Sequence, residues 1–111
     1  MNRLKAELWV EALIRRAELG FASAYVIRRG DENAGSVLVK VVSSTGLASL
    51  FVPTWDEKGD RIWAQFRSKP VSEREIDDYC GKRVNDDPDL WVIEIEDRQG
   101  RHFLTEPVEN S

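Results

Sequence analysis

The chain has 111 residues, a hydrophobic fraction of 41% and a charged fraction of 32%. This length suits one domain with its own core, and the composition excludes a disordered chain. The net charge of −4 disfavours binding to nucleic acid or to an anionic membrane, because phosphate groups attract basic proteins.

Cys80 is the only cysteine, which excludes an internal disulfide and a zinc site built from four cysteines. The charged residues Glu7 and Glu11 interrupt the N-terminal segment, so it lacks the apolar run of a signal peptide. No apolar run reaches the ~20 residues that cross a bilayer. We therefore expect a cytoplasmic protein that is not held in a membrane.

Residues 4–19 are predicted to form an amphipathic helix. Glu7, Glu11 and Arg15 recur at helical spacing, and apolar residues fill the opposite side. Gly20 follows this segment, where a glycine commonly ends a helix.

Residues 21–53 contain three apolar stretches separated by two turn segments rich in Gly, Asn, Asp and Ser. This pattern predicts consecutive antiparallel strands joined by short turns. Pro53 is expected to end the third strand, because proline has no N–H group for the ladder. A fourth strand is expected after the loop of residues 54–60. The four predicted strands are residues 23–28, 36–42, 47–52 and 61–67.

A second helix is predicted to begin at Ser72, since Ser72 and Glu75 have the spacing of a capping box. Asp87 stands before Pro88, which drives it out of helical geometry and ends the helix. A strand is expected over residues 90–96, a turn follows, and residues 101–104 are predicted to return as a short edge strand.

The expected fold is α+β, in the order α-β-β-β-β-α-β(-β). Five or six strands form a mostly antiparallel sheet, and both helices pack on one face of it. Residues 1–104 make a single domain, and residues 105–111 make a polar C-terminal tail.

The sequence contains no recognisable catalytic constellation, so we expect no catalytic residues, although an enzyme is not excluded. His102 is the one residue that titrates near neutral pH, and an exposed or hydrogen-bonding histidine near the end of the last hairpin is favoured over a general base or a metal ligand. Cys80 lies on the apolar stripe of the second helix, where ordinary packing is favoured over a nucleophile.

An acidic cluster near the end of the second helix lacks the spacing of a calcium loop. A solvated helix face is the favoured interpretation, and we expect neither a metal site nor a cofactor. The cluster consists of Asp77, Asp78, Asp86, Asp87 and Asp89.

The helix-free side of the predicted sheet is the candidate interaction surface. If both helices cover one face, large apolar side chains remain on the other, and such a patch usually marks a binding site. An alternative is that Trp55 and the loop of residues 54–60 cover this side. The candidate surface, called here the helix-free face, consists of Leu38, Phe51, Trp63, Arg67, Leu90 and Val92.

Three stretches of the chain, residues 4–16, 35–41 and 87–98, together resemble a family of short bacterial proteins whose domain has no known function. The resemblance spans about residues 3–103, and residues 87–98 are its most specific part. It implies one complete domain and supplies no catalytic residues.

The favoured function is a non-enzymatic interaction domain, which forms a homodimer or binds a cytoplasmic partner through the helix-free face. One alternative is a small acyl-CoA-binding or acyltransferase domain like the GNAT acetyltransferases, which rests on analogy of fold. A second alternative is an RNA-binding module, disfavoured by the acidic charge. Its candidate residues are Arg28, Arg61, Trp63 and Arg67.

Overall fold

The computed structural model describes residues 5–109, which form two helices and a six-stranded sheet. No helix in these residues is both long and apolar enough to span a membrane. The elements in chain order are α1 (Ala6–Leu19), β1 (Ser23–Arg28), β2 (Val37–Val42), β3 (Ala48–Trp55), β4 (Arg61–Gln65), a short 3₁₀ turn (Phe66–Ser68), α2 (Glu73–Asp86), β5 (Trp91–Glu96) and β6 (Val108–Glu109).

The sheet is mixed, with strand order β1-β5-β2-β3-β4-β6. β5 lies between β1 and β2, antiparallel to β1 and parallel to β2. The prediction of a mostly antiparallel sheet with β1 paired to β2 is therefore wrong. β2 and β5 carry buried apolar residues on both faces, and such strands are most stable in the centre of a sheet.

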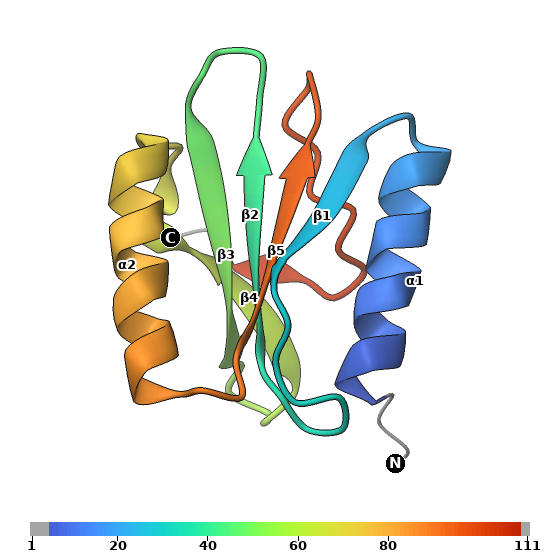
Figure 1. Ribbon diagram of the computed structural model, residues 1–111, viewed down its shortest axis with the longest axis vertical. Coiled ribbons are helices and arrows are strands. Elements are labelled where there is room, and N and C mark those ends of the chain that lie inside the picture. The colour runs from blue at the N-terminus through green and yellow to red at the C-terminus, as the bar shows by residue number, and fades with distance from the viewer. Residues whose placement is uncertain (1–4, 110–111) are drawn as a thin grey trace.

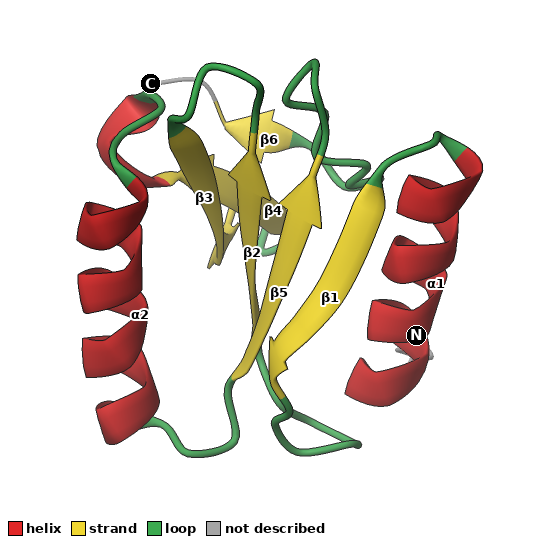
Figure 2. Cartoon of the chain, turned by 45° about the horizontal axis from the view of Figure 1, so that its top comes forward, coloured by secondary structure: helices red, strands yellow, loops and turns green. Residues whose placement is uncertain are grey.

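The two helices pack on opposite faces of the sheet, as Figures 1 and 2 show. Val10 and Leu13 of α1 share one core with Val39. Ile76 of α2 shares the other core with Leu38. The predicted arrangement with both helices on one face is wrong. Successive side chains of β2 are apolar and point to opposite faces of the sheet, so both faces need cover.

A C-terminal strap, residues 101–109, crosses the α1 face and ends in β6, which pairs in parallel with β4. Residues 101–104 are irregular, so the predicted edge strand is absent there. The polar tail predicted from Thr105 is also wrong up to residue 109. Leu104 and Val108 pack against the α1-side core, and the strap therefore covers the part of the face that α1 leaves open. Residues 110–111 lie outside the described part of the chain.

The connection between β1 and β2 must cross the end of β5, and two glycines make that crossing possible. A Cβ atom on Gly30 or Gly35 would collide with the carbonyl oxygen of Asp89, and it would also press on the ring of Trp91. Trp91 fixes the connection further, since its indole N–H donates a 2.7 Å hydrogen bond to the carbonyl oxygen of Asp31. These glycines allow close packing of two segments.

Pro53 lies inside β3, opposite Trp63 of β4, and does not end the strand as predicted. The pairing of β3 with β2 stops at Phe51. At Pro53 the strand therefore has a neighbour on one side, where a missing N–H group is tolerated. The predicted capping box is confirmed in part, because the Ser72 hydroxyl accepts a hydrogen bond from the backbone N–H of Glu75.

Candidate interaction surface

The predicted helix-free face does not exist as a surface. Leu38, Leu90 and Val92 belong to the core under α2, while Phe51 and Trp63 belong to the core on the α1 side. All five are buried. The sixth predicted residue, Arg67, is exposed and forms a 2.8 Å ion pair with Glu75.

Trp63 holds the strap in place and is closed to any ligand. Its indole N–H donates to one carboxylate oxygen of Glu106 at 3.1 Å, and the indole N–H of Trp9 donates to the other at 3.2 Å. The two rings lie 5.5 Å apart. Burial raises the pKa of Glu106, but the hydrogen bonds from Trp63 and Trp9 outweigh it and lower the pKa below its usual value.

Lys40 is a buried cation on the α2 face, with 5% of its surface exposed. Its Nζ atom lies 2.8 Å from Glu73, 3.0 Å from Asp77 and 3.1 Å from Glu94. Burial lowers the pKa of the ammonium group, but the three carboxylates raise it well above its usual value. Lys40 therefore stays charged at physiological pH and cannot act as a base or a nucleophile.

Cys80 is buried in the core under α2, and His102 is half-buried. Burial raises the pKa of the Cys80 thiol to about 11, and the Asp77 carboxylate adds to the effect, so the reactive thiolate is scarce at neutral pH. The Nδ1 atom of His102 accepts a 3.0 Å hydrogen bond from the backbone N–H of Leu104. Burial lowers the pKa of His102.

The acidic cluster at α2 is dispersed in space. Asp77 points to Lys40, while the Asp87 carboxylate accepts a hydrogen bond from the backbone N–H of Asp89. Within residues 5–109, no three His, Cys, Asp or Glu side chains are grouped to hold a metal ion.

The exposed apolar residues gather at the β1 edge of the sheet, a location that the sequence analysis missed. Five of the eight large apolar side chains that the structure shows as exposed lie within nine consecutive residues. Their exposed fractions run from 44% to 97%. This set, called here the β1 surface, is Leu19, Phe21, Tyr25, Val26 and Ile27.

β1 also presents an open backbone edge. It is the first strand of the sheet order, and its pairing partner in the described chain is β5 alone. The register shifts between Val26 and Arg28, which marks a bulge at Ile27. Uncharged residues fill β1 from Ser23 to Ile27, although natural edge strands are commonly protected by charges.

Acidic side chains flank the β1 surface on the α2 side of the sheet. Tyr25 lies opposite Glu94 in the register, and its hydroxyl group lies 3.4 Å from Glu96. Glu94 is bound to Lys40, whereas Glu96 forms no ion pair with any described residue.

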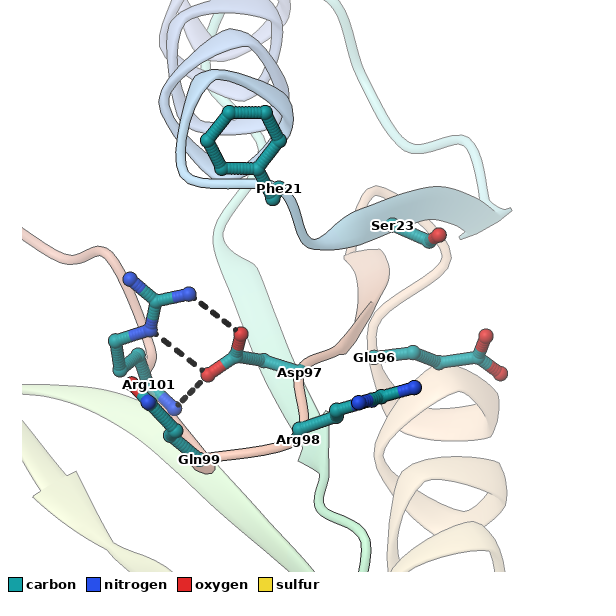
Figure 3. A pocket seen from close by; sticks show the side chains of 7 residues that line it. All are labelled: Phe21, Ser23, Glu96, Asp97, Arg98, Gln99 and Arg101. Atoms are coloured by element: carbon teal, nitrogen blue, oxygen red, sulfur yellow. Dashed lines mark hydrogen bonds and ion pairs between the residues drawn. The ribbon is translucent and has the colours of Figure 1, made fainter.

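A shallow depression of about 520 Å³ opens where β1 begins (Figure 3). Within it, Asp97 and Arg101 neutralise each other through contacts of 2.8 to 3.0 Å. Arg101 also donates to the carbonyl oxygen of Gly20 and so fixes the end of α1. The seven lining residues are Phe21, Ser23, Glu96, Asp97, Arg98, Gln99 and Arg101.

These features define a small α+β domain with a mixed sheet between two helices and an exposed apolar strand at one edge. The family model described as "Protein of unknown function (DUF1491)" matches residues 4–105. The chain therefore belongs to the DUF1491 family, in agreement with the resemblance noted from the sequence.

Solved structures of relatives have the same fold. The crystal structure of a DUF1491 family protein from Caulobacter crescentus is 52% identical, covers 96% of this chain and all of its own, and superposes with a TM-score of 0.91. An NMR structure of a DUF1491 family protein from Caulobacter crescentus, also 52% identical, covers 99% of this chain and all of its own, with a TM-score of 0.88. The solution structure of protein Atu0922 from A. tumefaciens is 30% identical, covers 99% of this chain and 98% of its own, and gives a TM-score of 0.82. No curated protein matches the chain.

Proposed function

We propose that this domain is a protein-interaction module, which binds an extended basic segment of a partner protein as an added strand along β1. The observation that carries the proposal is the β1 surface, where exposed apolar side chains coincide with an open backbone edge. Strand addition uses both features, because backbone hydrogen bonds supply affinity and alternate side chains supply specificity.

The partner is basic because two carboxylates, Glu94 and Glu96, lie on the α2 side beside Tyr25, while Arg28 at the end of β1 donates to the carbonyl oxygen of Pro88. A strand added to β1 would lie two strand spacings, roughly 10 Å, from β5. Long lysine and arginine side chains that extend over Tyr25 can approach these carboxylates from that distance. A second copy of the chain would bring another molecule with a net charge of −4, so charge favours a basic partner over a homodimer. We place this interaction in the cytoplasm, where a free cysteine such as Cys80 is ordinary.

The acyl-CoA alternative receives less support from the start of α2. Glu73 and Glu75 occupy its first turn, and the Ser72 hydroxyl already accepts the N–H of Glu75. Negative charge at this position opposes the binding of a pyrophosphate, which needs free N–H donors. The RNA alternative loses its stacking platform, because Trp63 is fully buried.

The proposal is tested by selecting binders from a random library of displayed twelve-residue peptides, followed by titration of the isotope-labelled domain with the selected peptides. Basic peptides should emerge, and the amide resonances of β1 should shift while those of α2 remain in place. Val26→Asp should abolish binding, since Asp disfavours strand pairing although its charge would attract a basic peptide. Leu47→Asp is the matched control, because Leu47 is similarly exposed but lies in the β2–β3 turn.

Three outcomes would overturn the proposal. These are a library that yields no binder, shifts that map away from β1, and self-association of the free domain in sedimentation experiments that Val26→Asp abolishes. The last result would identify a second copy as the occupant. Circular dichroism of each variant separates lost binding from lost folding, and Ile27→Asp, at the bulge, provides a second substitution on the same edge.

A further inference from the structure

The backbone groups that β1 turns to its open edge are those of Ala24 and Val26. The N–H group of Trp91, at the start of β5, donates to the carbonyl oxygen just before β2. Backbone groups alternate in direction along a strand, so Glu94 turns its groups to β1, where its register partner is Tyr25. Ala24 and Val26, on either side of Tyr25, therefore face away from β5. Within residues 5–109, no hydrogen bond reaches the outward groups of either residue.

The helix α1 runs alongside β1 in the opposite direction, as Figures 1 and 2 show. Two contacts align the two elements. Before β1, the N–H group of Ala22 donates to the carbonyl oxygen of Ala17 at 2.9 Å. After β1, Arg29 forms a 2.6 Å ion pair with Glu7. The stretch of α1 between these two contacts therefore lies beside the whole of β1.

The flank of α1 on the β1 side is acidic. The strap occupies the other flank, where Trp9 and Arg16 donate hydrogen bonds to it. Helical periodicity places a second row of side chains on the flank away from the strap. This row, called here the edge flank, consists of Glu7, Glu11, Ile14 and Glu18. Glu7 is neutralised by Arg29, whereas Glu11 and Glu18 form no ion pair with a described residue.

We propose that the partner segment pairs with the backbone of Ala24 and Val26 and carries basic side chains at the two positions opposite them, with Glu11 and Glu18 as counter-ions. The inference rests on the proposed function and specifies the register and the charge of its partner. Side chains at these two positions point to the α1 side, because Ala24 packs against the α1-side core and directly opposed residues share a face of the sheet.

The α1 side offers more uncommitted negative charge than the α2 side. On the α2 side Glu94 is bound to Lys40, which leaves Glu96. On the edge flank both Glu11 and Glu18 remain. A lysine or arginine stem can also cover the exposed part of Val26 while its charged end reaches the carboxylates.

The test uses two peptides with blocked ends, eight residues each, that alternate valine with lysine or with glutamine. Amide hydrogen exchange of the intact domain is followed by NMR. In the free domain the amides of Ala24 and Val26 should exchange faster than that of Tyr25, which is bonded to β5. The lysine peptide should slow exchange at Ala24 and Val26, and it should bind more tightly than the glutamine peptide.

Substitutions on α1 should change the affinity in opposite directions. Glu11→Gln/Glu18→Gln should weaken the lysine peptide by about fivefold, as expected for two exposed ion pairs, and should leave the glutamine peptide unchanged. Arg15 is exposed and lies within one helical turn of both carboxylates, so Arg15→Gln should strengthen the lysine peptide. Glu57→Gln/Glu109→Gln is the matched control, since it removes two exposed charges far from β1. The variants should remain folded, because glutamine is a good helix former.

Four outcomes would overturn the inference. These are equal binding of the two peptides, unchanged affinity in Glu11→Gln/Glu18→Gln, weaker binding in Arg15→Gln, and a larger loss in Glu96→Gln, which would place the basic side chains on the α2 side. If a peptide still slows exchange at Val26 in those cases, strand addition survives. If neither peptide slows it, the proposed function fails as well.

Discussion

The Nζ atom of Lys40 lies 3.1 Å from a carboxylate oxygen of Glu94, its direct partner in the parallel register of β2 and β5. This ion pair sits at the centre of the sheet, and α2 contributes Glu73 and Asp77 from above. One buried cation therefore joins two adjacent strands to a helix. A buried charge of this kind is costly once its partner is removed.

Lys40→Met should destabilise the domain by about 3 kcal/mol, the lower end of the range for breaking a buried pair. The lower end applies because Glu73 and Asp77 can turn to solvent, while Glu94 stays largely buried. The double variant Lys40→Met/Glu94→Leu should recover most of the loss. Urea unfolding measures both, with the exposed Lys58→Met as the control. A single variant as stable as the wild type would contradict this account.

The positions of most elements could be predicted from local signals in the sequence. Ser72 and Glu75 gave the start of α2, and the alternation of residues 23–28 gave β1 with its observed bounds. Such signals depend on residues close together in the chain. The signal that was missed is the double-sided apolar character of β2 and β5, since Leu38 and Val39 are both fully buried on opposite faces.

The candidate site could not be predicted, because it depends on strand order. Parallel pairing of β2 with β5 brings together residues about fifty positions apart, and local turn signals do not specify such pairing. That pairing buries Leu90 and Val92, which the sequence analysis placed on a surface. It also moves β1 to the edge, where Tyr25 and Ile27 become exposed.

Protonation of Asp97 should make the domain less stable at acidic pH. The hydrogen bond from the Arg101 side chain, with smaller contributions from backbone N–H groups, holds the pKa of Asp97 below its usual value. A carboxyl group with a lowered folded-state pKa stabilises the fold above its unfolded pKa of about 3.9, and this stabilisation is lost as the pH falls through the folded-state pKa.

The corresponding experiment compares wild type with Asp97→Asn by urea unfolding at pH 7, 5 and 3. The variant should be less stable at pH 7 and at pH 5, and the gap should narrow at pH 3. Glu57→Gln, at an exposed position in the β3–β4 loop, reports the background of ordinary carboxyl titration. A gap that is constant from pH 7 to pH 3 would show that the Asp97 charge does not contribute.

Glu106 should control the attachment of the strap. Glu106→Ala removes two hydrogen bonds from indole N–H groups to a carboxylate, and a loss of about 2 kcal/mol is expected for a partly exposed group. Tryptophan fluorescence should shift to the red as water reaches Trp9, and amide exchange should rise in residues 101–109 more than in β2. Glu109→Ala is the control at an exposed position of β6. Equal exchange in the strap of wild type and variant would argue against this role.

Cys80 should react slowly while the domain is folded. With a pKa of about 11, roughly one thiol in a thousand is ionised at pH 8, whereas about a quarter would be ionised at the ordinary pKa of about 8.5. Because the thiolate is the reacting species, alkylation by iodoacetamide in the native protein should be slower than in urea by more than about a hundredfold. Burial of the side chain slows the reaction further, and both effects act in the same direction.

The variant Lys40→Met separates the effect of the raised pKa from the effect of burial. Lys40 lowers the Cys80 pKa, so its loss should slow alkylation further if the packing around Cys80 stays closed. Faster alkylation in this variant would instead show that the Lys40 ion pairs keep α2 closed over the sheet.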